Sequence, residues 1–428
     1  MFAKKTIRDI DVKGKTVLLR ADFNVPIDAE GEIGSDYRIK QALPTIQYLI
    51  DHQAKVVICS HLGRPKGPHD AAASLFPVAK RLQRLLKRQV DFVPETVGPR
   101  AQKVVDVLKP GDVALLENLR FDKGEEQNDD NFAKALASLA DIFVQDGFGV
   151  VHRAHASTDA ITQHLPSVAG LLVEKEFITI QAVMQKPVRP MVAIIGGAKI
   201  SDKIEVLHKF IELADFVAVG GAMANTFLKA QGIKTGDSLV EDDSLPLARE
   251  ILAKARAKAK NQYFIFYLPQ DGVVAKSLNR NAPTRIVDWS SHIISEIENY
   301  PKRPPLHDSR VAHDEKILDI GPFSASFISG AMQLANTVVW NGTMGVTETE
   351  SLQGPVGPFA QGTELIIEAA TGHMGHRPFS VVGGGDTVGY IESRGITGMF
   401  NHVSTGGGAS LDLMTGRKLP GVESLGNK

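Results

Sequence analysis

The sequence predicts an α/β protein made of two Rossmann-like domains, each with a parallel sheet flanked by helices, joined by a connecting helix. Short apolar runs rich in β-branched residues alternate with longer segments in which apolar residues recur at helical spacing. This alternation is typical of strand-helix-strand units around a parallel sheet. The pattern occurs in both halves, and 428 residues exceed the size at which one hydrophobic core usually stops growing.

Apolar periodicity places the elements of the first half. Strands are expected at residues 17–19, 56–60, 113–116 and 142–144. One helix should present an apolar face made of Ile39, Leu43, Ile46 and Ile50. Pro44 disfavours a regular helix at the centre of that segment. A second helix should present Leu75, Val78, Leu82 and Leu85.

The second half repeats the pattern. Strands are expected at residues 192–195, 216–219, 263–268, 337–340 and 379–382. Between the halves, residues 170–183 have helical character and are followed by Pro187 and Pro190, which stop a helix. We therefore expect a first domain at residues 1–170, a connecting helix at 171–189 and a second domain at 190–403. The proline-rich residues 300–313 should form an exposed loop.

Charge and cysteine content exclude several classes of protein. With 48 Lys and Arg against 49 Asp and Glu, the formal net charge is -1, so no global basic field favours nucleic acid or an anionic membrane. No uncharged apolar stretch reaches the ~18 residues of a membrane span, and the N-terminal residues lack a signal-peptide core. The single cysteine, Cys59, lies in an apolar run and fits a reducing compartment. We expect a soluble cytoplasmic protein without nucleic-acid or membrane partners.

The residues that follow each expected strand indicate function, because ligands of open parallel sheets bind outside the carboxyl ends of the strands. In the first half these positions carry charged and amide side chains. They include Asp22, Asn24, His61, Arg64, Arg120 and Arg153. Guanidinium and imidazole groups suit a small molecule that carries carboxylate and phosphate. The first half therefore looks like an acid-phosphate site.

In the second half the corresponding positions are rich in glycine, at residues 196–197, 220–221 and 383–385. Glycines let the backbone approach a polyphosphate, and N–H groups at a helix start then meet its charge. Lys199 and Lys203 lie four residues apart, which would place both ammonium groups on one helical face. Asp386, at the tip of a glycine turn, suits a magnesium-bound nucleotide. The second half looks like a nucleotide site.

Each signal also has an ordinary structural interpretation. A glycine triplet is more often a turn than a phosphate cradle, by roughly three to one. Taken singly, Arg38 at a helix start is a solvated charge, His61 a hydrogen-bonded structural residue, and Asp386 a helix cap. Eight strand ends that divide into an arginine-rich and a glycine-rich set are harder to explain by packing alone.

Two phosphate-binding motifs are absent from the sequence. No G-x-x-x-x-G-K-[ST] motif occurs, which argues against a P-loop kinase, and no G-x-G-x-x-G follows a strand. Direct in-line phosphoryl transfer needs no protein nucleophile and matches the residues present. A sensor that binds a phosphorylated metabolite without turnover and a dehydrogenase are the alternatives. Lys199 and Asp386 argue against a sensor, and the missing glycine fingerprint argues against a dehydrogenase.

The whole chain resembles phosphoglycerate kinase, through seven motifs in the family's order. They read RADFNVP, SHLGRP, ENLRF, HRAHAS, GGAK, GGGDT and STGGGAS, and they begin at Arg20, Ser60, Glu117, His152, Gly196, Gly383 and Ser404. The resemblance implies a phosphotransferase with a carboxyl acceptor, which moves a phosphoryl group reversibly from 1,3-bisphosphoglycerate to ADP with Mg²⁺ in glycolysis and gluconeogenesis. It further implies a monomer with a hinge, in which residues 404–428 return to the first domain.

The resemblance also assigns residues to roles. The implied catalytic residues are Arg38, Lys199, Gly385 and Gly408. Those implied for 3-phosphoglycerate are Asp22, Asn24, Arg38, His61, Arg64, Arg120 and Arg153. Those implied for the nucleotide are Lys203, Gly220, Gly221, Gly321, Asn341, Glu348, Gly383, Gly384, Gly385, Asp386 and Thr387. Among these, Asp386 would bind the magnesium.

Several positions depart from the family's usual pattern. Thr343 stands where proline is usual, Ala222 replaces a third glycine, and Thr347 replaces an aromatic residue. Residues 354–358 resemble an insertion, and the loop at 301–313 is longer than usual. All but the last of these changes cluster at the nucleoside end. We therefore expect weak discrimination between adenine and guanine nucleotides, or weak ADP binding.

Overall fold

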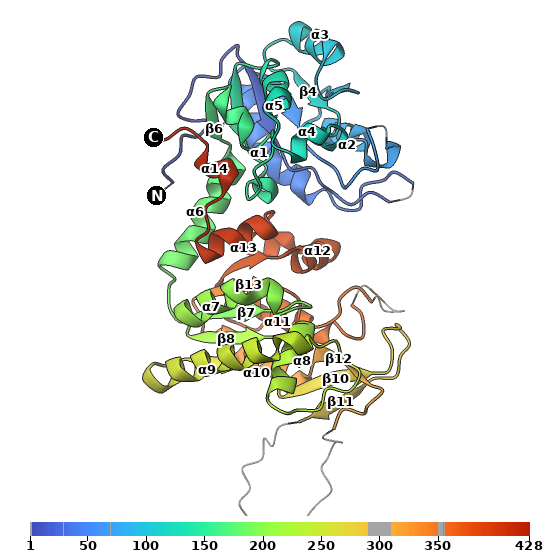
Figure 1. The fold of residues 1–428 in the computed structure, drawn as a ribbon, viewed down its shortest axis with the longest axis vertical. Coiled ribbons are helices and arrows are strands. Elements are labelled where there is room, and N and C mark those ends of the chain that lie inside the picture. Colours follow the sequence, from blue (N-terminus) through green and yellow to red (C-terminus); the bar gives the residue numbers. More distant parts are fainter. Residues whose placement is uncertain (1, 29, 69, 290–309, 350–353, 355) are drawn as a thin grey trace, which may run out of the picture. The chain divides into compact units, whose positions relative to one another are not determined.

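The chain folds into two compact units in the computed structural model, which describes residues 2–28, 30–68, 70–289, 310–349, 354 and 356–428. The first unit contains Met1–Gln181 and Thr405–Lys428, and the second contains Ala182–Ser404. Each unit has a six-stranded parallel sheet with helices on both faces (Figure 1), which confirms the predicted α/β class. The expected loop at 300–313 falls outside the described residues up to position 309, as does Pro355 of the expected insertion.

The sheet of the first unit has the strand order β3-β4-β2-β1-β5-β6, and every neighbouring pair is parallel. The strands are β1 (Thr16–Arg20), β2 (Lys55–Cys59), β3 (Asp91–Val93), β4 (Val113–Leu116), β5 (Ile142–Gln145) and β6 (Ser167–Ala169). The sequence predicts β1, β2, β4 and β5 to within one residue at each end. It misses β3 and β6, because three-residue edge strands are too short to show a periodic pattern.

Several helices accompany this sheet in the first unit, and apolar residues of the first two of them form one buried core with its strands. They are α1 (Tyr37–Asp51), α2 (Phe76–Leu86), α3 (Pro99–Val107), α4 (Lys123–Glu126), α5 (Asp130–Ala137), α13 (Gly408–Thr415) and α14 (Pro420–Glu423). Helix α1 continues through Pro44, which is exposed. Water can therefore satisfy the carbonyl of Lys40, which loses its N–H partner to the proline ring.

The C-terminal segment is tied to the first unit by backbone hydrogen bonds. The N–H of Gly421 donates to the carbonyl of Val151 at 2.9 Å, and that of Gly426 to Ser167 at 3.0 Å. The N–H of Lys5 in turn donates to the carbonyl of Gly426 at 2.7 Å. Residues from both ends of the chain therefore lie side by side (Figure 1).

The sheet of the second unit has the order β15-β14-β13-β7-β8-β9, again with parallel neighbours. Its strands are β7 (Met191–Ile195), β8 (Phe216–Val219), β9 (Ile265–Tyr267), β13 (Thr337–Asn341), β14 (Phe379–Gly383) and β15 (His402–Val403). The sequence predicts all of them except the two-residue β15. An antiparallel sheet made of β10 (Asp271–Ala275), β11 (Arg285–Asp288) and β12 (Lys316–Ile320) was not predicted, because none of its strands alternates strictly between buried and exposed positions.

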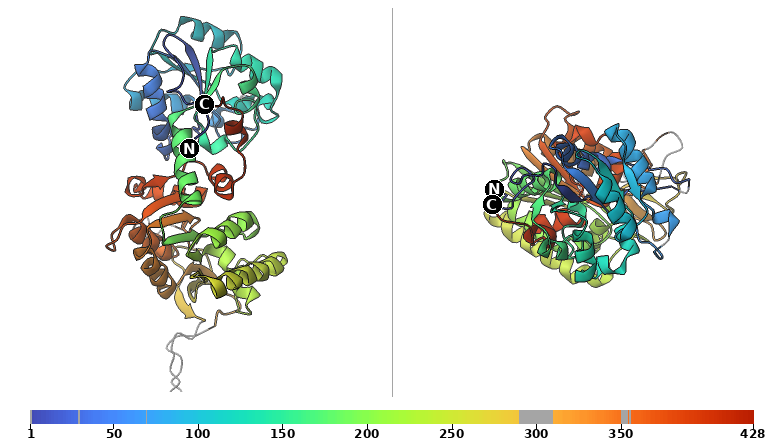
Figure 2. Two further views of the ribbon diagram at one scale, coloured as in Figure 1. Left: turned by 90° about the vertical axis from the view of Figure 1, so that its left-hand side faces the viewer. Right: turned by 90° about the horizontal axis from the view of Figure 1, so that it is seen from above.

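Helices cover both faces of the second sheet. They are α7 (Ile204–Leu213), α8 (Gly221–Ala230), α9 (Leu245–Asn261), α10 (Pro322–Gln333), α11 (Gln361–Thr371) and α12 (Gly385–Ser393). In Figure 2 the green and yellow helices α7, α8 and α9 lie on one side of the sheet, and α10 and α11 lie on the other. Helix α6 (Leu171–Gln185) carries the chain from the first unit into the second. No helix in the described ranges is long and apolar enough to cross a bilayer.

Candidate functional site

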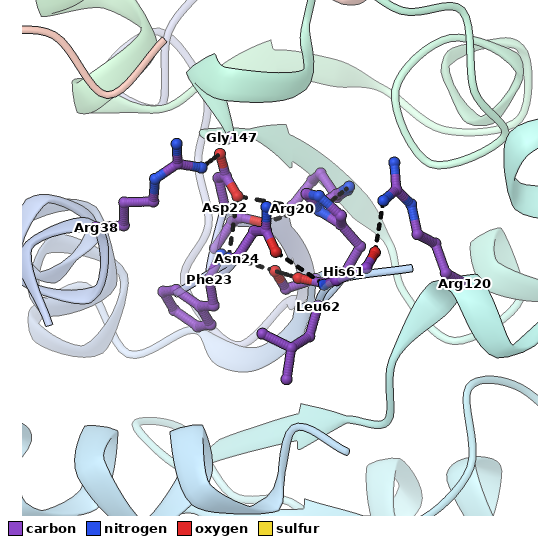
Figure 3. Close-up of polar contacts among 12 residues, drawn as sticks. Arg20, Asp22, Phe23, Asn24, Arg38, His61, Leu62, Arg120 and Gly147 are labelled. Carbon is purple, nitrogen blue, oxygen red and sulfur yellow. Dashed lines mark hydrogen bonds and ion pairs between the residues drawn. The ribbon is translucent and has the colours of Figure 1, made fainter. Parts of the chain in front are cut away.

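The carboxyl ends of the central strands in the first unit bring the predicted polar residues together. Asp22 follows β1, His61 follows β2, and Arg120 lies in the 3-10 turn after β4. Arg153 comes after β5, in the chain that follows a second 3-10 turn. Because these strands are parallel neighbours, their ends meet at one edge of the sheet. Figure 3 shows Arg38 and Arg120 on opposite sides of a central group that contains Asp22 and His61.

Asp22 is the centre of this group. Its Oδ2 accepts a hydrogen bond from Nη1 of Arg38 at 2.5 Å, and its Oδ1 accepts one from the N–H of Asn24 at 3.1 Å. Arg38 reaches Asp22 from the first turn of α1. A Cβ on Gly149 would lie 2.1 Å from Oδ2 of Asp22, so only glycine fits against this carboxylate. Asp22 thus holds Arg38 in a defined position at the sheet edge.

His61 is buried and neutral. Burial and the nearby guanidinium groups of Arg20 and Arg120 hold the pKa of His61 well below its usual range. Nη2 of Arg20 lies 3.4 Å from Nδ1 of His61, and a guanidinium can only donate, so Nδ1 is the acceptor. The proton of the neutral ring is therefore on Nε2. His61 can donate from this atom to an anionic ligand.

Two loops at the same edge hold further arginines. The backbone of Gly63 donates to Oδ1 of Asn24 at 2.8 Å and accepts from Nη1 of Arg120 at 2.6 Å. These two bonds fix the loop that carries the exposed Arg64. A cavity of about 460 Å³ is lined by Arg64, Pro65, Arg120, Glu126, Arg153 and His155. Burial, together with repulsion from Arg153 and Arg20, lowers the pKa of Arg120, so an anionic ligand would be favoured there.

A buried pair that the sequence analysis did not single out supports these groups. Arg20 and Glu125 are both fully buried, and the hydroxyl of Ser157 accepts from Nε of Arg20 and donates to Oε1 of Glu125. The signal was present in the sequence, since Arg20 is a charged residue at the end of an apolar strand. Such a position is either a ligand contact or a buried ion pair. In the structure, Arg20 forms a buried ion pair with Glu125.

Gly408 is also part of the first unit. It begins α13, after Gly407 with φ +48°. A Cβ on Gly408 would lie 3.1 Å from Nε2 of His152. The start of this eight-residue helix therefore lies beside His152, whose pKa is lowered by burial and by the neighbouring Arg153.

In the second unit, Lys203, Asn341 and Thr387 meet at the carboxyl ends of β13 and β14. Nζ of Lys203 donates to Oδ1 of Asn341, and the N–H of Gly342 donates to Oγ1 of Thr387 at 2.8 Å. Burial lowers the pKa of Lys203 to about 8, against the opposing effect of Asp386. Nδ2 of Asn341 is buried without a partner among the described residues. An unpaired buried donor and a desolvated ammonium group are both suited to a phosphate oxygen.

Glycine is required where the glycine-rich loops at these strand ends approach one another. Gly384 precedes α12 with φ +93°, and a Cβ there would lie 3.0 Å from Oδ1 of Asn341. Gly221 begins α8 with φ +65°, and its Cβ would lie 2.7 Å from the backbone N of Gly197. Gly383 and Gly385 flank Gly384, so the predicted glycine turn does open a helix.

A cavity of about 440 Å³ lies beside these loops, within the second unit. Its lining includes the predicted Gly221, Glu348 and Asp386 together with the altered Ala222 and Thr343. Thr347 is buried between two lining residues, so the three substituted positions lie in the wall of this cavity or next to it.

Two predicted glycines have close neighbours of their own. A Cβ on Gly220 would lie 2.5 Å from Sδ of Met344, which lines the cavity. A Cβ on Gly321 would lie 2.2 Å from the carboxyl of Asp271, and that carboxyl caps α10. The sequence analysis missed Asp319, a buried lining residue that accepts from the N–H of Gly362 at 2.8 Å. Burial raises the pKa of Asp319 to about 8.

The structure corrects the predicted setting of Lys199. Lys199 does not share a helical face with Lys203, because it lies in the loop that precedes the 3-10 turn Ser201–Lys203 and helix α7. Its side chain is exposed and makes no hydrogen bond or ion pair within the described ranges. The wrong expectation came from extending helical periodicity back into a glycine turn, where it does not apply.

Asp386 suits a magnesium ion that is carried by a nucleotide. The carboxylate is exposed in the first turn of α12 and lines the cavity. Among the described residues no group of three or more His, Cys, Asp or Glu side chains could hold a metal. A single carboxylate is nevertheless sufficient for Mg²⁺, which takes its other ligands from phosphates and water.

Comparisons with known proteins agree with this arrangement. Residues 7–417 match the family model described as phosphoglycerate kinase. The chain is 46% identical over 427 residues to the phosphoglycerate kinase of Moorella thermoacetica, with 100% of both chains covered. It is 45% identical over 424 residues to that of Chloroflexus aurantiacus, with 99% and 98% covered.

Solved structures agree as well. The phosphoglycerate kinase of Coxiella burnetii has a TM-score of 0.79 at 34% identity, with 98% of each chain covered. That of Pyrococcus horikoshii has a TM-score of 0.80 at 31% identity, with 99% of this chain and 98% of that chain covered. The matches extend over both units, with their arginine-rich and glycine-rich strand ends. The chain therefore belongs to the phosphoglycerate kinase family.

Proposed function

We propose that this chain catalyses the reversible transfer of a phosphoryl group from 1,3-bisphosphoglycerate to ADP, which gives 3-phosphoglycerate and ATP in glycolysis and gluconeogenesis. It is thus a phosphotransferase with a carboxyl group as acceptor, as its full-length relatives are named. The observation that carries the proposal is that the strand ends of the two sheets carry different kinds of residue. One sheet ends in a cluster of arginines around Asp22 and His61, and the other ends in glycine turns around Asn341.

The first unit binds 3-phosphoglycerate in this proposal. Arg38, Arg64, Arg120 and Arg153 supply the cationic groups, and His61 donates from Nε2. Asp22 and Asn24 hold Arg38 and the Gly63 loop in place. Support comes from the surroundings of His61, where burial and then the charges of Arg20, Arg120, Arg38 and Arg153 lower its pKa, and an anion would offset those charges. Both the carboxylate and the phosphate of the ligand would lower the energy of this cluster.

The second unit binds the nucleotide. Lys203, Asn341, Thr387 and the turn Gly383 to Gly385 would face its phosphates, at the start of α12. Glu348 would contact the ribose, with Gly220, Gly221 and Gly321 near the base. The 440 Å³ cavity, which Gly221 and Glu348 both line, is the physical support for this placement.

Transfer itself would depend on charge and position. The exposed ammonium group of Lys199, which has no partner in the described ranges, would meet charge on the migrating phosphoryl group. Arg38 and the N–H groups at Gly385 and Gly408 would add donors. Asp386 would hold Mg²⁺, which neutralises phosphate charge when bound.

Each region of the chain can be assigned a role according to the site that it contains. Residues 1–170 would form the 3-phosphoglycerate domain, 171–189 the connecting helix, 190–403 the nucleotide domain, and 404–428 the segment that returns to the first domain. Contacts within each unit support this division. We place the enzyme in the cytoplasm as a monomer, in keeping with its one cysteine, which is free and buried.

A coupled assay tests the proposal. Purified protein is supplied with 3-phosphoglycerate, ATP and Mg²⁺, and formation of the acyl phosphate is followed through a reductive coupling enzyme. We expect turnover that depends on all three components. Tight binding of 3-phosphoglycerate without turnover, by folded protein supplied with either ATP or GTP, would instead establish the sensor alternative.

A further inference from the structure

The loop that presents Lys199 is fixed on both sides. On its N-terminal side, the carbonyl of Gly197 accepts a hydrogen bond from the N–H of Met223 at 2.9 Å, at the start of α8. On its C-terminal side, the side chain of Ile200 is fully buried. Only Ala198 and Lys199 between these points are exposed.

Glu241 makes the polar contacts on the C-terminal side. Its Oε2 accepts from the N–H of Ile200 at 2.5 Å and from the N–H of Ser201 at 3.3 Å. Its Oε1 accepts from the hydroxyl of Ser201 at 2.7 Å. These are the backbone groups directly after Lys199, and one carboxylate satisfies both of them.

Glu241 is itself anchored to the scaffold of the nucleotide site. Its backbone N–H donates to Oγ1 of Thr226 at 3.1 Å, and Thr226 is buried on α8. Two residues earlier, the carbonyl of Leu239 accepts from Nδ2 of the buried Asn225 on the same helix. The backbone that carries the Glu241 side chain is therefore held by α8, which begins at Gly221 beside Gly197.

We propose that Glu241 is a positioning residue for phosphoryl transfer, which holds the loop so that Lys199 points its ammonium group at the transferring phosphate. The sequence analysis did not name it, and it lies 42 positions after Lys199 by the numbering. The inference rests on the proposed function of Lys199. A lysine side chain has four rotatable bonds, so a fixed backbone at Ile200 and Ser201 is needed to limit where its ammonium group can lie.

The carboxylate has a second consequence. The N–H groups of Ile200 and Ser201 lie at the start of the turn that leads into α7, where an anion would otherwise be attracted. The carboxylate of Glu241 already accepts hydrogen bonds from both N–H groups. A nucleotide phosphate is therefore directed to Lys199, Lys203 and the start of α12 instead of this turn.

A double-mutant cycle with steady-state kinetics tests the proposal. Glu241→Ala should lower kcat by about tenfold or more, because the reacting groups are no longer oriented, while the KM values for both substrates change by less than about threefold. Glu241→Gln should lower kcat less than Glu241→Ala does, because the amide oxygen of Gln can still accept a hydrogen bond from the N–H of Ile200. Asp243→Asn removes the same charge two residues away, at an exposed side chain, and should leave kcat unchanged.

The cycle distinguishes positioning of Lys199 from a general structural role. In the Lys199→Ala background, Glu241→Ala should lower kcat by no more than about twofold further, because the two residues act as one unit. An equal loss in both backgrounds, or a kcat of Glu241→Ala near that of the parent enzyme, would overturn the proposal.

Hydrogen exchange provides a readout that does not depend on activity. In Glu241→Ala, the amides of Ile200 and Ser201 should exchange faster, whereas those of β7 and α8 should not. If Glu241→Ala does not fold, Glu241→Gln and Ser201→Ala take its place in the same measurements. Absence of turnover in the parent enzyme would refute the proposed function, and unchanged exchange at these amides would separately refute the role of Glu241.

Discussion

Arg20 and Glu125 lie fully buried in the first unit and share the hydroxyl of Ser157, which accepts from Nε of Arg20 at 2.7 Å and donates to Oε1 of Glu125 at 2.6 Å. The same carboxylate accepts from the N–H of Ser157 at 3.0 Å. This arrangement keeps Arg20 beside His61 at the edge of the sheet. The proposed acid-phosphate site would therefore depend on a buried ion pair that need not contact the ligand.

Removing Glu125 should destabilise the protein strongly. Glu125→Ala leaves the guanidinium group of Arg20 buried without its counter-charge, which typically costs about 3 to 5 kcal/mol. Ser157→Ala removes only the shared hydroxyl and should cost about 1 to 3 kcal/mol. Urea titration followed by circular dichroism gives the free energy of unfolding of each variant. Equal, small losses for both would show that the ion pair contributes little.

The contribution of His61 and His155 to stability should fall as the pH drops below about 6.5. Burial and nearby arginines lower the pKa of His61 well below its usual range and that of His155 to about 4. In the unfolded state both histidines therefore take up protons near the ordinary histidine pKa of about 6.5, whereas in the folded state they do not. The stabilising contribution is present above that pH and is lost progressively as the pH falls below it.

Thermal unfolding between pH 7.5 and 5 measures this effect. In His61→Gln the fall in Tm over that range should be smaller than in the parent protein. His164→Gln is a suitable control, since His164 pairs with Asp130 at 2.6 Å at the surface. If Tm changed over this range by the same amount in His61→Gln as in the parent protein, the folded protein would not lower the pKa of His61.

Asp386→Asn should weaken binding of the magnesium nucleotide. The carboxylate is the one acidic side chain in the first turn of α12, it lines the 440 Å³ cavity, and an amide is a poorer Mg²⁺ ligand. We expect the Kd for Mg·ADP to rise by about tenfold, or ~1.4 kcal/mol. Titration calorimetry with and without Mg²⁺ tests the assignment. A similar loss for Mg²⁺-free ADP would mean that Asp386 acts on the nucleotide and not through the metal.

Discrimination between adenine and guanine nucleotides should be weak. Ala222 adds a methyl group to the wall of the 440 Å³ cavity, and Thr347 gives less bulk than an aromatic residue. The ratio of kcat/KM for ADP to that for GDP should be less than about tenfold, and Ala222→Gly should raise it. A strong preference for ADP in the parent enzyme would reject this interpretation.

The sequence predicts the strands that carry the sites better than the elements around them. Strands such as β1 and β13 are short continuous apolar runs because both faces are covered, and a polar residue marks the end of each run. The antiparallel strands β10 to β12 escaped prediction, because none of them alternates strictly between buried and exposed positions. The fold class could therefore be predicted from the pattern, whereas the smaller sheet, whose strand β12 lines the 440 Å³ cavity, could not.

Residues that act through other residues were the hardest to predict. Asp22 and Asn341 stand at strand ends, where position alone suggests a ligand. Glu241 lies in a loop far from Lys199 in the sequence, and only the folded chain shows that it accepts from Ile200 and Ser201. The same holds for Glu125, which follows a turn and is buried by long-range packing against Arg20.

The most direct test of this account measures which unit binds which substrate. Titration calorimetry with 3-phosphoglycerate and with Mg·ADP is carried out on the parent protein, Arg153→Ala and Asn341→Ala. Arg153→Ala should weaken 3-phosphoglycerate binding by about tenfold or more and leave Mg·ADP binding within about twofold, and Asn341→Ala should show the reverse. If either variant weakened the binding of both ligands equally, or neither ligand bound the folded parent protein, the assignment of an acid-phosphate site to the first unit and a nucleotide site to the second would be wrong.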